Sequence, residues 1–191
     1  TFSELLEPLA RRAGRRVLAP AMPGYHPTGP MPGGDYTVRR LGRAVLDLMD
    51  ALGVEQADLL GHDWGAAAAY SVAAQAPERV RRLITAAVPH PRVFLASLLR
   101  AYQARKSWYM FYFQLPWRPQ RQVARDDFAF LERLWRDWSP DWDYSEADFG
   151  PVREAFSHPG VVLHALAYYR AILAPRPANL KVFLGNVSTP I

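Results

Sequence analysis

The chain has 191 residues, half of them apolar, and a formal net charge of +5 at neutral pH. It can therefore bury a substantial core, and because it has neither a run of about 18 apolar residues nor a basic leader, we expect a soluble, cytoplasmic protein without membrane contact. The absence of cysteine excludes disulfides and thiolate zinc sites.

The positive charge comes almost entirely from arginine, in short clusters such as residues 11–12, 39–43 and 79–82. These clusters fall on separate predicted helices and turns, without a nucleic-acid-binding motif or a continuous basic stripe. They indicate solvated helix faces, and we expect no nucleic-acid partner.

No grouping of histidine and carboxylate has metal-ligand spacing, so neither a metal nor a cofactor is expected.

The first 35 residues read as a helix, a strand and a loop. Residues 2–15 carry leucines at helical spacing, and residues 16–20 form a short apolar run that predicts a strand. The Pro- and Gly-rich loop 20–35 follows at the carboxyl end of that strand, where open α/β sheets place ligands.

Strand and helix then alternate. The pattern predicts an amphipathic helix over 36–52, a strand over 56–61, an Ala-rich helix over 66–76 and a strand over 82–88. This alternation is typical of a parallel sheet in an α/β fold.

From residue 91 to 177 the pattern changes to helices with no convincing strand, and 18 of the 24 aromatic residues fall in this part. We expect an inserted all-helical lid that covers the carboxyl edge of the sheet and roofs a substrate pocket. A strand-like run returns at 178–184. The expected organisation is a partial core over 1–90, the lid over 91–177 and a return to the core over 178–191.

Residues 61–65 read Gly-His-Asp-Trp-Gly, which has the Gly-x-nucleophile-x-Gly form of a strand-to-helix turn with Asp63 as the nucleophile. Side chains at the two glycine positions would collide with the neighbouring strand and helix. The helix N-terminus favours the ionised carboxylate. A carboxylate attacks carbon electrophiles with ring strain or a good leaving group and forms an ester, which suits epoxides and alkyl halides.

With Trp64 directly after Asp63, the chain resembles the α/β-hydrolase superfamily, in particular its epoxide hydrolase and haloalkane dehalogenase branch. Residues 16–25 are similar to the strand and Pro-Gly-Tyr loop before the nucleophile unit, although Ala21 stands where many relatives have Asp. The resemblance implies an α/β-hydrolase parallel sheet core with a helical lid. It also implies that the chain is a piece that lacks the first oxyanion loop, the catalytic acid and the base histidine, and that it is poorly stable and inactive alone.

The resemblance also implies two lid tyrosines. Ring opening leaves an alkoxide, so an epoxide hydrolase donates a hydrogen bond or proton to the ring oxygen. Tyr109 in the segment 107–116 and Tyr169 look like these donors. Tyr112 and Tyr168 neighbour the pair closely enough to exchange roles with it, and aromatic residues at this density are also common core residues.

Trp64 is expected to contribute its backbone N–H to the oxyanion hole and its indole to the pocket. In the dehalogenase branch the corresponding indole holds the halide, so Trp64 does not separate the two activities, whereas lid tyrosines favour epoxides. His90 follows the strand after the turn and is a candidate pocket residue. We interpret His62, packed beneath the turn, and two lid histidines, His158 and His164, as structural.

The leading hypothesis is therefore a hydrolase that opens epoxides to diols through an ester on Asp63. The alternatives are a dehalogenase of the same fold and a noncatalytic relative that serves as a binding module. The aromatic lid favours small apolar substrates, aryl epoxides among them. The sequence does not indicate the oligomeric state.

Overall fold

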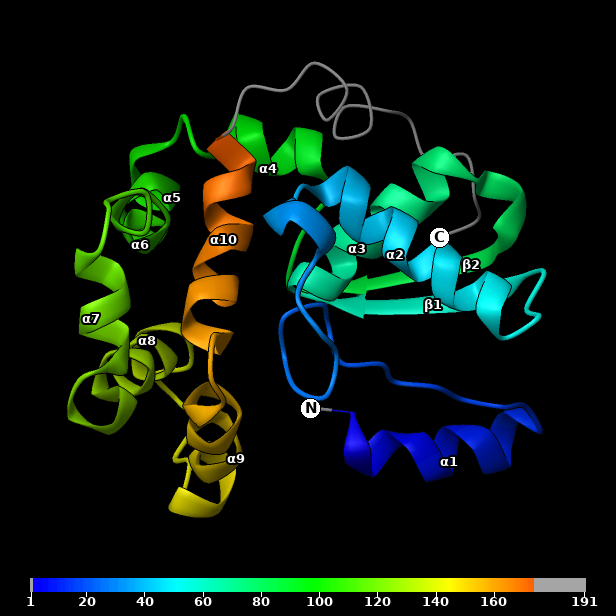
Figure 1. Cartoon of the computed structure of the whole chain (residues 1–191), viewed down its shortest axis with the longest axis horizontal. Helices are drawn as coiled ribbons and strands as arrows, with labels where there is room; N and C mark the ends of the chain where they lie inside the picture. Colours follow the sequence, from blue (N-terminus) through cyan, green and yellow to red (C-terminus); the bar gives the residue numbers. More distant parts are fainter. Residues whose placement is uncertain (1, 174–191) are drawn as a thin grey trace.

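The computed structural model describes residues 2–173 and consists of a two-stranded parallel sheet, the helices around it and a helical part (Figure 1). The expected strand at 178–184 lies outside the described residues. No helix in the described range is long and apolar enough to cross a membrane.

The sheet joins β1 (Ala57–His62) to β2 (Val80–Ala86) in parallel, from Ala57 opposite Val80 to His62 opposite Ala86. Between them runs α3 (Trp64–Gln75), which packs with α2 (Val38–Ala51) on one face of the sheet. These four elements confirm the predicted alternation. The core between them holds Leu46, Met49, Val72 and Leu83, each at most 6% exposed.

The strand predicted over residues 16–20 is wrong, because this segment has no strand structure. Within residues 2–173 the sheet has only the order β1-β2, and neither strand pairs with residues 16–20. An extended segment becomes a strand only through hydrogen bonds to a neighbour, which an apolar run cannot supply by itself.

Helix α1 (Ser3–Ala13) confirms the first predicted helix, and it lies on the opposite side of the sheet from α2 and α3 (Figure 1). It ends at Gly14, whose φ of 59° gives the left-handed conformation that glycine adopts without strain. Its Leu5 and Leu9 side chains are 48% and 41% exposed, so the leucine spacing predicted the helix but not a buried face in the described part of the chain.

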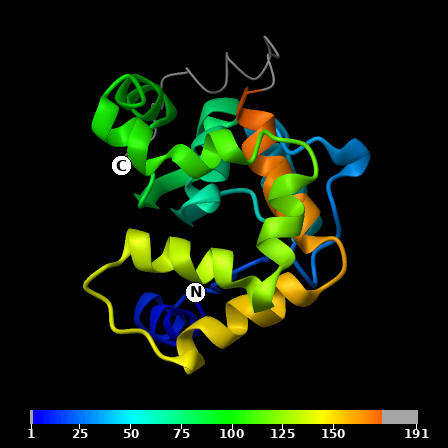
Figure 2. The same cartoon turned by 90° about the vertical axis from the view of Figure 1, so that its left-hand side faces the viewer.

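The helical part covers residues 91–173. Its helices are α4 (Pro91–Ser97), α5 (Ala101–Lys106), α6 (Trp108–Tyr112), α7 (Arg118–Ala124), α8 (Ala129–Trp138), α9 (Glu146–Ser157) and α10 (Val161–Leu173). Helix α10 lies between α6 and α7 on one side and the α2–α3 layer on the other, and both views place α9 and α1 at the same end of the molecule (Figures 1 and 2).

Two clusters hold the helical part together and join it to the sheet. One, within the helical part, includes Phe113, Val123 and Leu166. The other includes Tyr36, of the 20–37 segment, and Tyr168 of α10, packed with residues of α2 and α3. Helix α10 therefore belongs to both clusters and connects the helical part to the core.

Candidate active site

The turn from β1 to α3 holds Asp63 in a backbone conformation that side chains other than glycine rarely adopt, with φ 51° and ψ −119°. Hydrogen bonds on both sides fix it there. The Asp63 N–H donates to the Ala86 carbonyl at 3.3 Å, while its carbonyl accepts from the N–H groups of Ala66 and Ala67 at 3.0 and 3.2 Å. The end of β1 and the first turn of α3 therefore determine where the carboxylate points.

The two glycines of the turn play different parts. A Cβ on Gly61 would lie 2.5 Å from the Gly65 carbonyl oxygen and 2.7 Å from the Ala66 Cα, so only glycine fits at position 61. A Cβ on Gly65 meets nothing within 4 Å among the described residues. The expectation that both positions exclude side chains is confirmed for Gly61 and is wrong for Gly65 among the described residues. Gly65 instead contributes the backbone carbonyl that Gly61 approaches.

Two opposing effects act on the Asp63 carboxylate. Its side chain is accessible from the cavity, yet the surrounding protein desolvates it enough to raise its pKa above that of a free aspartate. A hydrogen bond from the Trp64 backbone N–H and the proximity of His62 lower the pKa, but burial outweighs both. The helix N-terminus alone therefore does not set the ionisation of this group.

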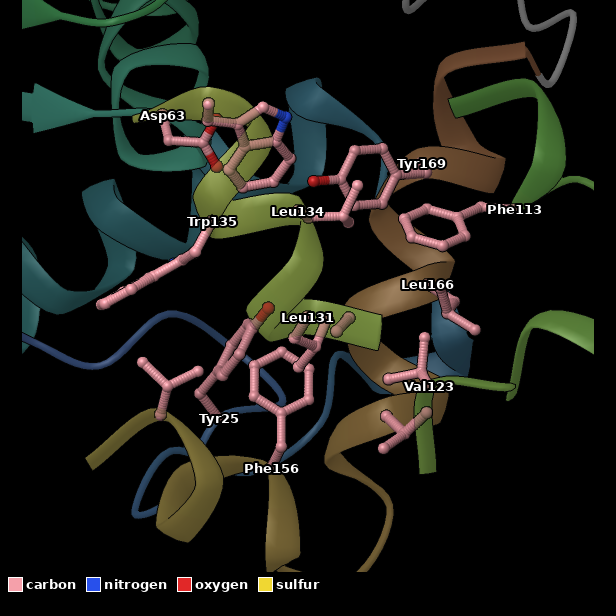
Figure 3. A pocket seen from close by; sticks show the side chains of 14 residues that line it. Tyr25, Asp63, Phe113, Val123, Leu131, Leu134, Trp135, Phe156, Leu166 and Tyr169 are labelled. Atoms are coloured by element: carbon pink, nitrogen blue, oxygen red, sulfur yellow. The ribbon is translucent and has the colours of Figure 1, made fainter. Parts of the chain in front are cut away.

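Asp63 opens onto a cavity of about 140 Å³ between the turn and the helical part (Figure 3). Most of the lining side chains are apolar and come from α7 to α10, and the only side-chain oxygens of the lining belong to three residues. These are Asp63, Tyr169 and Tyr25. The full lining is Tyr25, Asp63, Phe113, Val123, Leu131, Leu134, Trp135, Trp138, Val152, Phe156, Val162, Ala165, Leu166 and Tyr169.

Tyr169 of α10 lines the cavity, and Figure 3 shows its hydroxyl directed toward Asp63. Its ring makes edge contacts with Trp64, at 5.2 Å between centroids, and with Tyr109, at 5.7 Å. Burial raises the pKa of Tyr169 well above its usual value, the Asp63 charge adds to the rise, and a hydrogen bond from the Trp64 side chain partly offsets it. Burial, and then Asp63, also raise the pKa of Tyr109 to about 12. The predicted residues Asp63, Tyr109 and Tyr169 thus meet in one region, and both phenols are held in the neutral, hydrogen-donating form.

The neighbouring tyrosines lie elsewhere. Tyr168 is 1% exposed and donates its hydroxyl to the Pro23 carbonyl at 2.6 Å, on the side of α10 that faces the 20–35 loop. Tyr112 packs its ring against Trp108 and Phe130 and does not line the cavity. Tyr109 does not line the cavity either, but its ring contacts that of Tyr169 and the Asp63 charge helps to raise its pKa. Between the alternatives left by the sequence, the geometry therefore favours Tyr109 and Tyr169 as the pair beside Asp63.

No histidine lines the cavity among the described residues. His90 does not reach it and packs edge-on against Tyr70 at 5.2 Å, while His62 is exposed rather than packed beneath the turn. His158 stacks on His26 at 4.2 Å and His164 packs against Tyr36. Over the same residues no group of three or more histidines and carboxylates could hold a metal ion.

Tyr25 is the cavity residue that sequence reasoning missed. It belongs to the Pro-Gly-Tyr segment of the 20–35 loop, whose position predicts ligand binding but indicates no role for the tyrosine. Burial, followed by the charge of Asp63, raises its pKa above the usual value. The loop position was the signal that could have identified it.

Comparison with known proteins agrees with this architecture. Residues 1–137 match the model of the alpha/beta hydrolase fold family. The chain is 33% identical to human epoxide hydrolase 4 over 85% of its length, and 33% identical to the AB hydrolase superfamily protein YfhM of Bacillus subtilis over 87%. It spans 47% and 60% of these two proteins, respectively.

Solved structures give the same result. A putative epoxide hydrolase from Klebsiella pneumoniae superposes on 97% of this chain, and on 65% of its own, with a TM-score of 0.77 at 27% identity. The Bacillus megaterium epoxide hydrolase in complex with an inhibitor covers 84% of this chain, and 57% of its own, with a TM-score of 0.69 at 30% identity. The chain therefore belongs to the alpha/beta hydrolase fold family, within which it is similar to epoxide hydrolases.

Proposed function

We propose that this chain carries the ring-opening half of an epoxide hydrolase site, with Asp63 as nucleophile and Tyr109 and Tyr169 as donors to the ring oxygen. The observation that carries the proposal is the position of the Tyr169 hydroxyl, which is directed across an apolar cavity toward the carboxylate of a strained turn (Figure 3). Residues 91–177, which supply both phenols, act as the lid of the site.

In the first step an Asp63 carboxylate oxygen attacks a ring carbon, the carbon–oxygen bond of the ring breaks, and its electron pair goes to the ring oxygen. The hydroxyls of Tyr109 and Tyr169 stabilise the developing alkoxide and supply its proton. Their raised pKa values keep them protonated at neutral pH, and an alkoxide is a stronger base than the tyrosinate that remains. The product is a hydroxyalkyl ester of Asp63.

In the second step one water molecule adds to the ester carbonyl and the diol leaves, which restores the carboxylate and releases the proton that returns the tyrosinate to its neutral form. The Trp64 backbone N–H already donates to Asp63 and serves as an oxyanion donor when charge develops on the ester carbonyl oxygen. The described cavity lining contains no histidine, so the base that activates water comes from outside it.

Halide release fits this cavity less well. The Trp64 indole, which the sequence predicted in the pocket, is not among the side chains that line the cavity and lies edge-on against the Tyr169 ring, at 5.2 Å between centroids. The two phenols donate a hydrogen bond and a proton to a leaving oxygen atom, and a halide leaves a carbon–halogen bond without needing such a proton.

The proposal is tested by incubating the purified chain with styrene oxide and recording intact masses. Asp63→Asn keeps the side-chain shape and removes the nucleophile, and Asp143→Asn makes the same change at an exposed aspartate outside the cavity. We expect the parent and Asp143→Asn to gain one epoxide mass, mapped to Asp63 by peptide analysis, or to release phenylethanediol. Neither product is expected from Asp63→Asn. Labelling of Asp63→Asn at the parental rate would overturn the proposal. A folded parent chain that gives neither ester nor diol would also overturn it, and this is the result expected of a noncatalytic binding module.

A further inference from the structure

One hydroxyl of the cavity has no part in the chemistry proposed above. Of the three lining residues that carry side-chain oxygens, Asp63 attacks and Tyr169 donates to the ring oxygen, which leaves Tyr25. Tyr25 enters from the 20–35 loop, not from α10, and in Figure 3 its hydroxyl points into the space below Asp63 and Tyr169. No hydrogen bond joins this hydroxyl to another described residue.

The ring of Tyr25 is firmly held. It makes an edge contact with Phe156 of α9 at 5.9 Å and a tilted contact with Tyr168 of α10 at 6.2 Å. Tyr168 in turn donates to the carbonyl of Pro23, two residues before Tyr25. At the residue between them, Gly24, a Cβ would lie 2.6 Å from the His164 Cβ, so the loop backbone is pressed against α10. The Tyr25 hydroxyl is therefore presented at a fixed place.

A fixed hydroxyl in an apolar cavity discriminates between ligands. A purely apolar ligand would remove water from it and leave it unpaired, whereas a ligand oxygen at the same place would replace that water. Sites that hydrogen-bond a ligand oxygen select strongly against analogues that lack it. The remaining side chains of the lining, from Phe113 at the end of α6 and from α7 to α10, offer only carbon atoms and indole N–H groups.

We infer that Tyr25 is a specificity-determining residue that hydrogen-bonds an ether or hydroxyl oxygen of the substrate, so that epoxides with such an oxygen are preferred over their hydrocarbon analogues. This inference rests on the proposed function, because it assigns the substrate class of the same site. Tyr25 takes no part in bond breaking.

The test compares two epoxides of the same shape. Phenyl glycidyl ether has an oxygen between its aryl ring and its epoxide group, and 1,2-epoxy-4-phenylbutane has a methylene there. For Tyr25→Phe we expect the rate constant for ester formation on Asp63 to fall about tenfold with the ether and to stay unchanged or rise with the carbon analogue. Tyr112→Phe, which loses a hydroxyl outside the cavity lining, should leave both rates unchanged.

An equal change of both rates in Tyr25→Phe would overturn the inference, because a structural defect affects the two epoxides alike. Circular dichroism checks the fold of the variant, which loses no hydrogen bond to a described residue.

A binding experiment gives a second test. The fluorescence of Trp135 and Trp138 in the cavity wall reports the dissociation constants of the two epoxides for Asp63→Asn, with and without Tyr25→Phe. If neither epoxide reacts with the parent chain, the proposed function fails. The ratio of dissociation constants then still decides the inference, which is overturned if that ratio is the same with Tyr25 and with Phe.

Discussion

At the residue scale, Gly61 matters as much to the turn as Asp63. The close approach of Gly61 to the first residues of α3 lets the chain reverse within one residue of β1, and this reversal places Asp63 in its positive-φ conformation. A strained conformation of this kind costs on the order of 1–3 kcal/mol and persists only where its surroundings enforce it. The backbone contact at Gly61 is part of that enforcement.

We expect Gly61→Ala and Gly65→Ala to differ sharply. The first substitution forces a Cβ against backbone atoms of α3 and should lower the free energy of unfolding by about 2–3 kcal/mol. The second adds a methyl group in open space near the start of a helix and should change it by less than about 1 kcal/mol, in the stabilising direction. Urea unfolding followed by circular dichroism measures both. Equal destabilisation by the two variants would contradict this account of the turn.

At the scale of elements, α10 performs two tasks with adjacent residues. Successive residues of a helix are rotated by about 100°, so Tyr168 faces the 20–35 loop while Tyr169 faces Trp64 and Tyr109. One hydroxyl fastens the helix to the loop and the other enters the cavity. The helix thereby fixes the cavity hydroxyl relative to the turn that holds Asp63.

Removing these two hydroxyls separately should separate stability from reactivity. Tyr168→Phe leaves the Pro23 carbonyl without its partner and should lower the free energy of unfolding by about 1–2 kcal/mol. Tyr169→Phe should change stability less but slow ester formation on Asp63 at least about tenfold, because the ring oxygen loses a donor. Thermal unfolding and intact-mass labelling of both variants test this. A slower reaction in Tyr168→Phe than in Tyr169→Phe would show that Tyr168, not Tyr169, is the donor to the ring oxygen.

The sequence predicted elements well where the pattern was long and local. Helix α2 and the alternation of β1, α3 and β2 follow from periodicity and the Gly-rich turn, and the structure confirms them within a few residues. The strand at residues 16–20 was wrong because pairing with a neighbour, not the apolar run, makes a strand. The preference for Tyr169 over Tyr168 came from the family resemblance, because periodicity does not determine the rotation of α10 against its neighbours.

At the scale of the whole molecule, the cavity is an assembly of distant parts. Asp63 comes from the sheet, Tyr25 from the loop before α2, and Tyr169 from the last described helix. Sequence motifs identified the first and the last through local context and family resemblance. They missed Tyr25 because its role depends on contacts with α9 and α10 that lie more than 100 residues later in the chain.

Buried phenols should make this molecule sensitive to alkali. In the folded chain the pKa of Tyr109 is raised to about 12 and those of Tyr25, Tyr168 and Tyr169 are raised as well, in each case chiefly by burial. In the unfolded chain tyrosine titrates near its ordinary value of about 10. Above that pH the unfolded chain therefore binds fewer protons than the folded one, and the free energy of unfolding falls as pH rises through the folded-state pKa values.

We expect little loss of stability from this source below pH 10 and, for Tyr109, a loss on the order of 2 kcal/mol between about pH 10 and 12. Urea unfolding across this range measures the slope, and tyrosinate absorbance reports the titration. Tyr109→Phe should reduce the loss, whereas Tyr102→Phe, at a position 70% exposed on α5, should not. A slope unaffected by Tyr109→Phe would show that other groups control alkaline unfolding.

The arrangement of α10 also limits how this chain can change in length. Each residue inserted or deleted within the helix before Tyr168 would turn the following side chains by about 100°, and it would carry both hydroxyls away from their partners together. Substitutions along α8 and α9 can reshape the cavity wall without this effect. Insertions and deletions are compatible with the site in segments such as residues 139–145, which join α8 to α9 and contribute no side chain to the cavity lining.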